Sequence, residues 1–321
     1  MSEKATALVT GGAGFIGSNL VDRLLGDGHQ VVCLDNFNDF YDPAIKRSNI
    51  SEHLKNNSYT LVEGDIRDAK LVDSLFDTHE PEIVIHLAAR AGVPGSLNDP
   101  VLYVDVNERG TAVLLNAANT HCVHQFIFGS SSSVYGVSSP LPFSADEVAV
   151  HPISPYAASK RAGELLCYTF HHLYGLNVLC ARFFNVYGPR SRPDAVMYRF
   201  TNAILNDKPI TVYGDGTSRR DYTFIDDIVD GLVRSIGQDF GYEIINLGRS
   251  DTVILNDLIT ITEEALGRKA KVERRPDRLG DVPATYADIE KSRRVIGFEP
   301  KVDIREGMRR YVEWYRKTYG G

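Results

Sequence analysis

Short apolar runs alternate with amphipathic stretches through the first half of the chain. Each run is rich in Val, Ile, Leu or Phe and predicts a buried strand. These runs are residues 5–9, 31–34, 59–62, 83–87, 125–128 and 177–181. Stretches with helical spacing, such as 15–25 and 101–119, lie between them. Repeated strand–helix units predict a parallel sheet with helices on both faces, which is a doubly wound α/β fold.

The pattern loosens after residue 185, where glycines and prolines divide the chain into short segments. We predict a Rossmann-type domain over residues 1–185 and a smaller C-terminal α/β lobe that binds a substrate over 186–321. The boundary is soft, because residues 222–234 have the pattern of a helix that packs back on the sheet. Segments such as 222–250 are therefore candidates to return to the first domain.

Composition and charge narrow the class of protein. A chain of 321 residues with 43% apolar and 24% charged residues is typical of a two-domain globular protein. The net charge of −7 leaves no basic footprint for nucleic acid. No apolar stretch is long enough to span a membrane and the first residues lack a signal-peptide pattern, so we expect a cytoplasmic protein. The four cysteines form no C-x-x-C pair and the histidines have no metal-ligand spacing, so we expect reduced thiols and no metal.

A glycine-rich loop follows the first predicted strand. In residues 10–17, Gly12, Gly14 and Gly17 fit G-x-G-x-x-G, and Gly11, Gly14 and Gly17 fit a G-x-x-G-x-x-G variant. Glycines at these positions allow a tight turn, close approach to a pyrophosphate and close helix packing. The loop lies between a strand and a helix, as this mechanism requires, and therefore predicts a dinucleotide site.

Two acidic residues follow the next two strands. Asp35 ends the second strand, where a carboxylate suits the ribose hydroxyls of NAD and repels the 2′-phosphate of NADP. Asp65 follows the third strand, where an adenine edge would lie, although an N-cap for the next helix explains it nearly as well.

Candidate catalytic groups follow the fifth strand and begin the next helix. Tyr156 and Lys160 are four residues apart, so a helix starting near Ser154 puts both on one face. A cation beside a phenol lowers its pKa, which would make Tyr156 a general base. The serines at 130–133 end the fifth strand at the edge where such sheets bind ligands. No G-x-S-x-G elbow surrounds them, which argues against a serine hydrolase.

Together these motifs resemble the extended short-chain dehydrogenase/reductase family, specifically the NAD-dependent nucleotide-sugar 4-epimerases. The resemblance covers nearly the whole chain. It rests on residues 10–17, 86–89, 131–136, Tyr156 with Lys160, 182–189, 220–222 and 278–281.

The resemblance implies a bound NAD that is not consumed. Tyr156 would take the proton of the sugar 4-hydroxyl while C4 passes a hydride to NAD, and the 4-keto sugar would regain the hydride on its other face. Ser131 would hydrogen-bond O4, and Lys160 would hold the nicotinamide ribose. The implied cofactor-binding residues are Gly11, Gly14, Phe15, Ile16, Gly17, Asp35, Asn36, Asp65, Ile66, Leu87, Ala88, Ala89, Tyr156 and Lys160.

The resemblance also implies a UDP-sugar substrate and a homodimer built on the helices 101–119 and 155–173. Asn185 would meet the diphosphate–sugar region, Arg220 and Arg278 the phosphates, Asp281 the nucleotide ribose and Tyr213 the uracil. The implied substrate-binding residues are Ser131, Ser132, Ser133, Asn185, Arg192, Tyr213, Arg220, Arg278 and Asp281.

Two positions distinguish the reactions of related enzymes. Nucleotide-sugar 4,6-dehydratases carry an Asp-Glu pair where this chain has Ser132 and Ser133. UDP-glucuronate decarboxylases usually carry Glu at the position of Ser133. Both absences favour epimerisation, and decarboxylation stays as a weaker alternative.

The sequence indicates less clearly which sugar the UDP-sugar substrate carries. Arg192, with the segments 35–41 and 89–93, resembles UDP-glucuronate 4-epimerases, and Arg192 would pair with the C6 carboxylate. Asn185 is typical of UDP-glucose 4-epimerases instead, and Pro94 replaces a common arginine. We favour conversion of UDP-glucuronate to UDP-galacturonate over UDP-glucose/UDP-galactose, with N-acetylhexosamines third.

Overall fold

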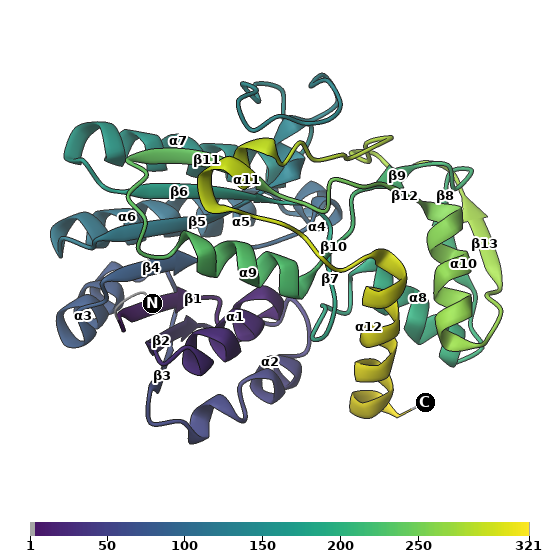
Figure 1. Cartoon of the computed structure of the whole chain (residues 1–321), viewed down its shortest axis with the longest axis horizontal. Helices are drawn as coiled ribbons and strands as arrows, with labels where there is room; N and C mark the ends of the chain where they lie inside the picture. The colour runs from purple at the N-terminus through teal and green to yellow at the C-terminus, as the bar shows by residue number, and fades with distance from the viewer. Residues whose placement is uncertain (1–3, 321) are drawn as a thin grey trace.

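The computed structural model describes residues 4–320, and its centre is a seven-stranded parallel sheet in the order β11-β6-β5-β4-β1-β2-β3 (Figure 1). The strand order reverses between β1 and β4, so their carboxyl ends form a topological switch point, where open α/β sheets bind ligands. The strands are β1 (Thr6–Thr10), β2 (Gln30–Asp35), β3 (Tyr59–Glu63), β4 (Ile83–His86), β5 (Gln125–Ser131), β6 (Val178–Phe183) and β11 (Tyr242–Leu247).

Helices cover both faces of the sheet. On one face, α1 (Phe15–Gly26) packs beside α9 (Ile225–Ser235). On the other face lie α3 (Ala69–His79), α6 (Gly110–Thr120) and α7 (Pro155–Tyr174). The five central strands, β6, β5, β4, β1 and β2, are almost wholly buried, which explains why they are continuous apolar runs in the sequence, whereas the edge strands β3 and β11 are partly exposed. The predicted Rossmann-type fold is confirmed.

A smaller group of elements lies beyond one end of the sheet, at the right of Figure 1. There α10 packs against α8 and α12, and β8 pairs in parallel with β13. These elements are α8 (Val196–Leu205), β8 (Ile210–Tyr213), α10 (Leu255–Leu266), β13 (Val272–Arg275) and α12 (Ile304–Tyr319). Between them in the chain, α9 and β11 lie on the large sheet, and β11 pairs with β6. The division of the chain at residue 185 stays a prediction.

The long helix expected over residues 101–119 is instead α5 (Pro100–Val104), a π-helical turn (Asp105–Arg109) and α6. The turn places Asn107 inside the fold, where its side chain bonds both backbone groups of Arg90. Its amide also donates to Ser159 of α7. A π turn adds one residue to a helix turn and is common at functional sites.

The remaining elements are short. They are α2 (Pro43–Asn49), α4 (Val93–Asn98), α11 (Glu290–Ile296), the 3-10 turns His53–Lys55 and Ser132–Tyr135, and the two-residue strands β7 (Val186–Tyr187), β9 (Arg219–Arg220), β10 (Thr223–Phe224) and β12 (Val253–Ile254). Within residues 4–320, no helix is long and apolar enough to cross a membrane.

Candidate active site

Two adjoining cavities lie at the carboxyl ends of the sheet strands. The first is lined by residues that follow β1, β2, β3 and β4. The second, of about 770 Å³, extends from the end of β5 to the smaller group of elements and has the size of a small-molecule site. Tyr156, Phe40 and Arg192 line both cavities, so a ligand in one would meet a ligand in the other.

The glycine loop forms the floor of the first cavity. Gly11 has a φ of +70°, and a Cβ there would lie 2.8 Å from the backbone N of Ala88. A Cβ on Gly17 would lie 2.2 Å from the carbonyl O of Gly11. Both positions therefore require glycine. Helix α1 begins at Phe15, directly after Gly14, whose missing side chain leaves the first helix amides open to an anion.

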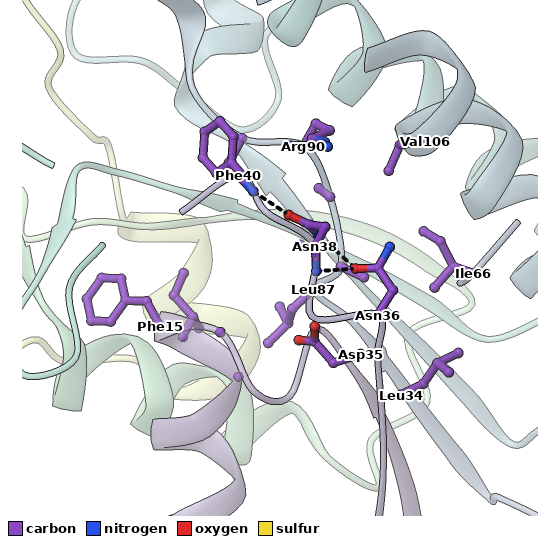
Figure 2. Close-up of a pocket in the computed structure, with 18 of the residues that line it drawn as sticks. Phe15, Leu34, Asp35, Asn36, Asn38, Phe40, Ile66, Leu87, Arg90 and Val106 are labelled. Carbon is purple, nitrogen blue, oxygen red and sulfur yellow. Dashed lines mark hydrogen bonds between the residues drawn. The ribbon is translucent and has the colours of Figure 1, made fainter. Parts of the chain in front are cut away.

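Asp35 (labelled in Figure 2) and Asp65 both line the first cavity, and each is held by a cation that the sequence analysis missed. Lys46 Nζ lies 3.1 Å from Asp35 Oδ1, and both side chains are buried. Arg67 donates to both carboxylate oxygens of Asp65 and holds its pKa at about 2. A carboxylate can accept about four hydrogen bonds. Asp35 accepts three within the chain and so keeps capacity for a ligand, whereas Asp65 already accepts four, from Asn36 and Arg67.

The other residues expected to bind the cofactor also lie around this cavity. Asn36, Ile66, Leu87, Ala88 and Ala89 line it together with Phe15 and Ile16 (Figure 2).

His86 ends β4 beneath this cavity and is fully buried. Its ring nitrogens contact the hydroxyls of Thr10 at 2.7 Å and Thr111 at 3.0 Å. Burial, with a smaller effect of Lys160, lowers the pKa of His86 to about 3. The imidazole is therefore neutral at pH 7 and supports the strand rather than transferring protons.

Tyr156 and Lys160 lie on the same helix, α7, and both line the first cavity. The hydroxyl of Ser154 caps the helix by accepting from the amide of Ala157 at 3.2 Å. Lys160 Nζ donates to the carbonyl of Gly129 at 2.7 Å. Burial lowers the pKa of Lys160 to about 8, while the buried Glu164 opposes this shift.

The expected effect of Lys160 on Tyr156 stays a prediction. Burial raises the pKa of the Tyr156 phenol, and a hydrogen bond to Ser131 and the charge of Arg192 oppose that rise. The ammonium of Lys160 donates to the strand carbonyl of Gly129 rather than to the phenol. Arg192 is therefore a cation that favours phenolate.

The serines after β5 divide into two groups. Ser130 donates to the buried Glu164 at 2.6 Å and so stabilises the link between β5 and α7. Ser131, Ser132 and Ser133 line the second cavity. The Ser131 hydroxyl donates to the Ser133 hydroxyl at 3.1 Å and accepts from the Ser133 amide at 3.2 Å. Ser131 is thus fixed beside Tyr156.

The far end of the second cavity carries Tyr213, Arg220, Arg278 and Asp281. The Arg278 guanidinium lies 4.2 Å from the centre of the Tyr213 ring, and its Nε is 3.1 Å from Asp281. Burial, together with the charge of Arg278, lowers the pKa of Arg220. Two guanidinium groups at this end of the cavity favour an anionic ligand. Arg199, which the sequence analysis missed, lines the same cavity.

Asn185 and Arg192 lie nearer the junction of the two cavities. Asn185 Oδ1 accepts from the hydroxyl of Thr285 at 3.2 Å. Arg192 Nε and Nη2 donate to the carboxylate of Asp194 at 2.9 and 3.0 Å. Arg192 is therefore fixed by a carboxylate of its own chain, next to Tyr156.

Comparison with known proteins places this geometry in a family. The family model described as GDP-mannose 4,6 dehydratase matches residues 8–311. The chain belongs to this family. Its resemblance to the extended short-chain dehydrogenase/reductases that act on nucleotide sugars is thereby confirmed.

Three relatives in this group show what similar chains do. The UDP-glucuronate 4-epimerase of Thermodesulfobacterium geofontis is 44% identical over 97% of this chain and 96% of its own. The crystal structure of UDP-glucuronic acid 4-epimerase from Bacillus cereus, with UDP-glucuronic acid and NAD, has a TM-score of 0.93 and 34% identity over 98% of this chain and 100% of its own. That of UDP-glucose 4-epimerase from Thermotoga maritima, with UDP-glucose, has a TM-score of 0.90 and 34% identity over 98% and 99%.

Proposed function

We propose that this chain is an isomerase that epimerises a UDP-sugar at C4 with bound NAD, converting UDP-glucuronate to UDP-galacturonate through a transient 4-keto intermediate. The observation that carries the proposal is the meeting of Tyr156, Ser131 and Arg192 where the two cavities join. These side chains supply a proton acceptor, a hydrogen bond for the reacting oxygen and a cation for the uronate.

The first cavity fits a dinucleotide. Open amides at the start of α1 suit a pyrophosphate, and the carboxylate of Asp35 suits ribose hydroxyls. NAD, when bound there, would supply the hydride chemistry at C4 of the sugar. The chain's own residues hold the sugar and move the proton.

Tyr156 is the proposed general base. Its phenolate oxygen accepts the proton of the 4-hydroxyl and gives it back after the sugar has turned over. Ser131, hydrogen-bonded to Tyr156, holds O4 in line with the phenol. Arg192 favours the phenolate by charge, which offsets part of the effect of burial.

Arg192 is the proposed contact for the C6 carboxylate. Asp194 occupies Nε and Nη2, and within residues 4–320 Nη1 makes no hydrogen bond. The fork is therefore held in place with N–H groups left for a second carboxylate. Holding that carboxylate also restrains loss of CO2 from the 4-keto intermediate, which is a β-keto acid.

The nucleotide end of the substrate is assigned to the far end of the second cavity. Arg220 and Arg278 bind the diphosphate, Asp281 the ribose hydroxyls and Tyr213 the uracil. The pKa of Arg220, lowered by burial and by Arg278, supports this assignment, because an anion between the two would relieve their repulsion.

A neutral hexose is the second candidate substrate, because Asn185 lines the same cavity and is held by Thr285. Dehydration and decarboxylation are less well supported. The positions where related enzymes carry their extra acids are Ser132 and Ser133, whose side chains cannot act as carboxylic acids.

We also propose a homodimer in the cytoplasm. Val101 and Val104 on α5 and Leu165 and Tyr168 on α7 are 46–76% exposed, and the two helices are in contact. Exposed apolar groups on adjacent helices mark an interaction surface. Light scattering after gel filtration tests the dimer: a mass of one chain, 35.6 kDa, would contradict it.

The experiment that tests the proposed function compares three substrates. Purified protein is incubated with UDP-glucuronate, UDP-glucose and UDP-N-acetylglucosamine, and the products are separated by chromatography and mass. A 4-epimer of unchanged mass from UDP-glucuronate alone is expected. A 4-epimer only from a neutral sugar would show that the substrate is a neutral UDP-hexose, as Asn185 indicates, and not UDP-glucuronate. A product lighter by CO2 would overturn epimerisation.

A further inference from the structure

The first cavity contains five cationic side chains, and four of them have close polar partners within the chain. Lys46 is paired with Asp35, Arg67 with Asp65 and Asp105, Lys160 with the Gly129 carbonyl, and Arg192 with Asp194. The fifth is Arg90.

The guanidinium of Arg90 makes no hydrogen bond within the described chain. Its side chain is only 18% exposed, and its nearest carboxylate is that of Asp39, 4.0 Å away and 95% exposed. A guanidinium has five N–H donors and cannot lose its charge, so leaving it largely buried without a partner is unfavourable. The surroundings of Arg90 therefore favour an anion that the chain itself does not provide.

The backbone of Arg90 is fixed near the glycine loop. Asn107 accepts from the Arg90 amide at 2.7 Å and donates to its carbonyl at 3.0 Å. Two residues earlier, the backbone of Ala88 lies so close to Gly11 that a Cβ there would be 2.8 Å away. The base of the Arg90 side chain is thus held beside the loop whose helix amides receive the phosphates.

The Arg90 side chain points away from the part of the cavity that would hold the adenosine of the dinucleotide. Arg90 lies on the side that carries Phe40, 5.5 Å from the ring centre, and away from Leu34 and Asp35 (Figure 2). Arg90 lines the first cavity but not the second, whereas Arg192 lines both. Its position therefore favours the cofactor over the sugar carboxylate.

We propose that Arg90 binds the pyrophosphate of the bound dinucleotide and slows its release. The helix amides of α1 would bind the phosphates from one side, and the guanidinium of Arg90 would bind them from the other. This inference rests on the proposed function only for the identity of the cofactor, and it does not depend on which sugar is epimerised.

The test measures exchange of the bound cofactor rather than turnover. Holoenzyme is mixed with excess isotopically labelled NAD, and native mass spectrometry follows the replacement of bound NAD. Loss of a charge-assisted contact should make exchange in Arg90→Gln about ten- to hundred-fold faster. Arg90→Lys, which keeps the charge but loses the fork, should lie between.

The matched control is Arg23→Gln, which removes the same charge from an exposed pair with Asp27 outside both cavities. It should exchange NAD at the wild-type rate. Circular dichroism shows whether each variant is folded.

A second measurement locates the contact along the dinucleotide. ADP-ribose has the pyrophosphate and adenosine lacks it. In Arg90→Gln, adenosine should displace NAD more easily than in wild type, because only NAD loses the pyrophosphate contact, whereas displacement by ADP-ribose should be unchanged, because both ligands lose it.

Three results would overturn the inference. They are wild-type exchange in Arg90→Gln, the same change in displacement by adenosine and by ADP-ribose, and a raised KM for the UDP-sugar with unchanged NAD exchange. A wild-type protein that holds no NAD would instead contradict the proposed function itself.

Discussion

The cofactor cavity and the substrate cavity meet at Tyr156 and Arg192 but are built in different ways. The first is made from consecutive strand ends of one sheet, and most of its cations are paired with acids or carbonyls of the chain. The second draws on separate segments between residue 15 and residue 285, and it places Arg220 and Arg278 where their charges oppose each other. The positive charges of the cofactor cavity are thus largely balanced by groups of the chain itself. The positive charge of the substrate cavity is balanced fully only when an anionic ligand binds.

This difference separates the expected effects of substitution. Changes around the first cavity alter stability and cofactor retention, because its charges are partners of one another. Changes around the second alter specificity and KM, because within residues 4–320 it has four arginines and only two carboxylates, Asp194 and Asp281. Tyr156 belongs to both cavities and to the chemistry, so its loss should have the largest effect.

Tyr156→Phe removes the group that accepts the substrate proton. We expect kcat to fall by about 10²–10⁴-fold, the usual contribution of a general base, while bound NAD is retained. Turnover is followed by chromatography of the UDP-sugars, and the NAD content is measured in the same sample. Turnover at the wild-type rate would show that Tyr156 is not the base.

Glu164→Gln breaks the buried ion pair beneath the first cavity. Glu164 accepts from Arg182 at 2.8 and 2.9 Å, and both side chains are at most 1% exposed. Leaving Arg182 without its partner should lower the free energy of unfolding by about 3–5 kcal/mol, measured by urea denaturation. The control Glu306→Gln alters an exposed helix pair and should leave the midpoint nearly unchanged. Equal urea midpoints for the two variants would show that the buried pair of Glu164 and Arg182 does not stabilise the fold.

Arg192→Ala tests the substrate cavity. Loss of charge-assisted hydrogen bonds to the uronate should reduce kcat/KM for UDP-glucuronate by about 10–100-fold, with a much smaller loss on UDP-glucose. The matched control is Arg190→Ala, which removes an arginine of the same loop that pairs with Asp22 outside both cavities. Equal losses on the two sugars would mean that Arg192 does not recognise the carboxylate.

The smallest expected effect is a shift in the titration of Tyr156. Arg192 lowers the pKa of the phenol, so Arg192→Met should raise that pKa and move phenolate formation to higher pH. Ultraviolet absorption of tyrosinate in the holoenzyme measures the change, and Tyr156→Phe identifies the signal. An unchanged or lowered pKa of Tyr156 would show that the charge of Arg192 does not stabilise the phenolate.

The sequence predicted the fold well because the five central strands of the sheet are buried on both faces. Six strands were visible as apolar runs, but β11 was not, since only Ile245, Asn246 and Leu247 of its six residues are fully buried. The π turn at Asp105–Arg109 was not predicted either, because it depends on Asn107 reaching the backbone of Arg90. Such long-range contacts leave no periodic signal.

For the site, local motifs were sufficient where neighbours in the chain are neighbours in space. The loop 10–17 and the pair Tyr156 and Lys160 are of this kind. Lys46, Arg67 and Asp194 were missed as partners, because a single charged residue in a loop does not reveal which charge it will meet. The hydrogen bond from the Lys160 ammonium to the Gly129 carbonyl was also missed, because only the folded chain brings these two groups together.

The most direct test of epimerisation by hydride return within one active site uses UDP-glucuronate deuterated at C4. The purified holoenzyme is incubated with this substrate without added NAD. The expected product is the 4-epimer, UDP-galacturonate, with unchanged mass. The deuterium should still be at C4, because the same hydride leaves and returns within one active site. Loss of the deuterium, a product lighter by CO2, or no product from this substrate while UDP-glucose is converted would contradict it.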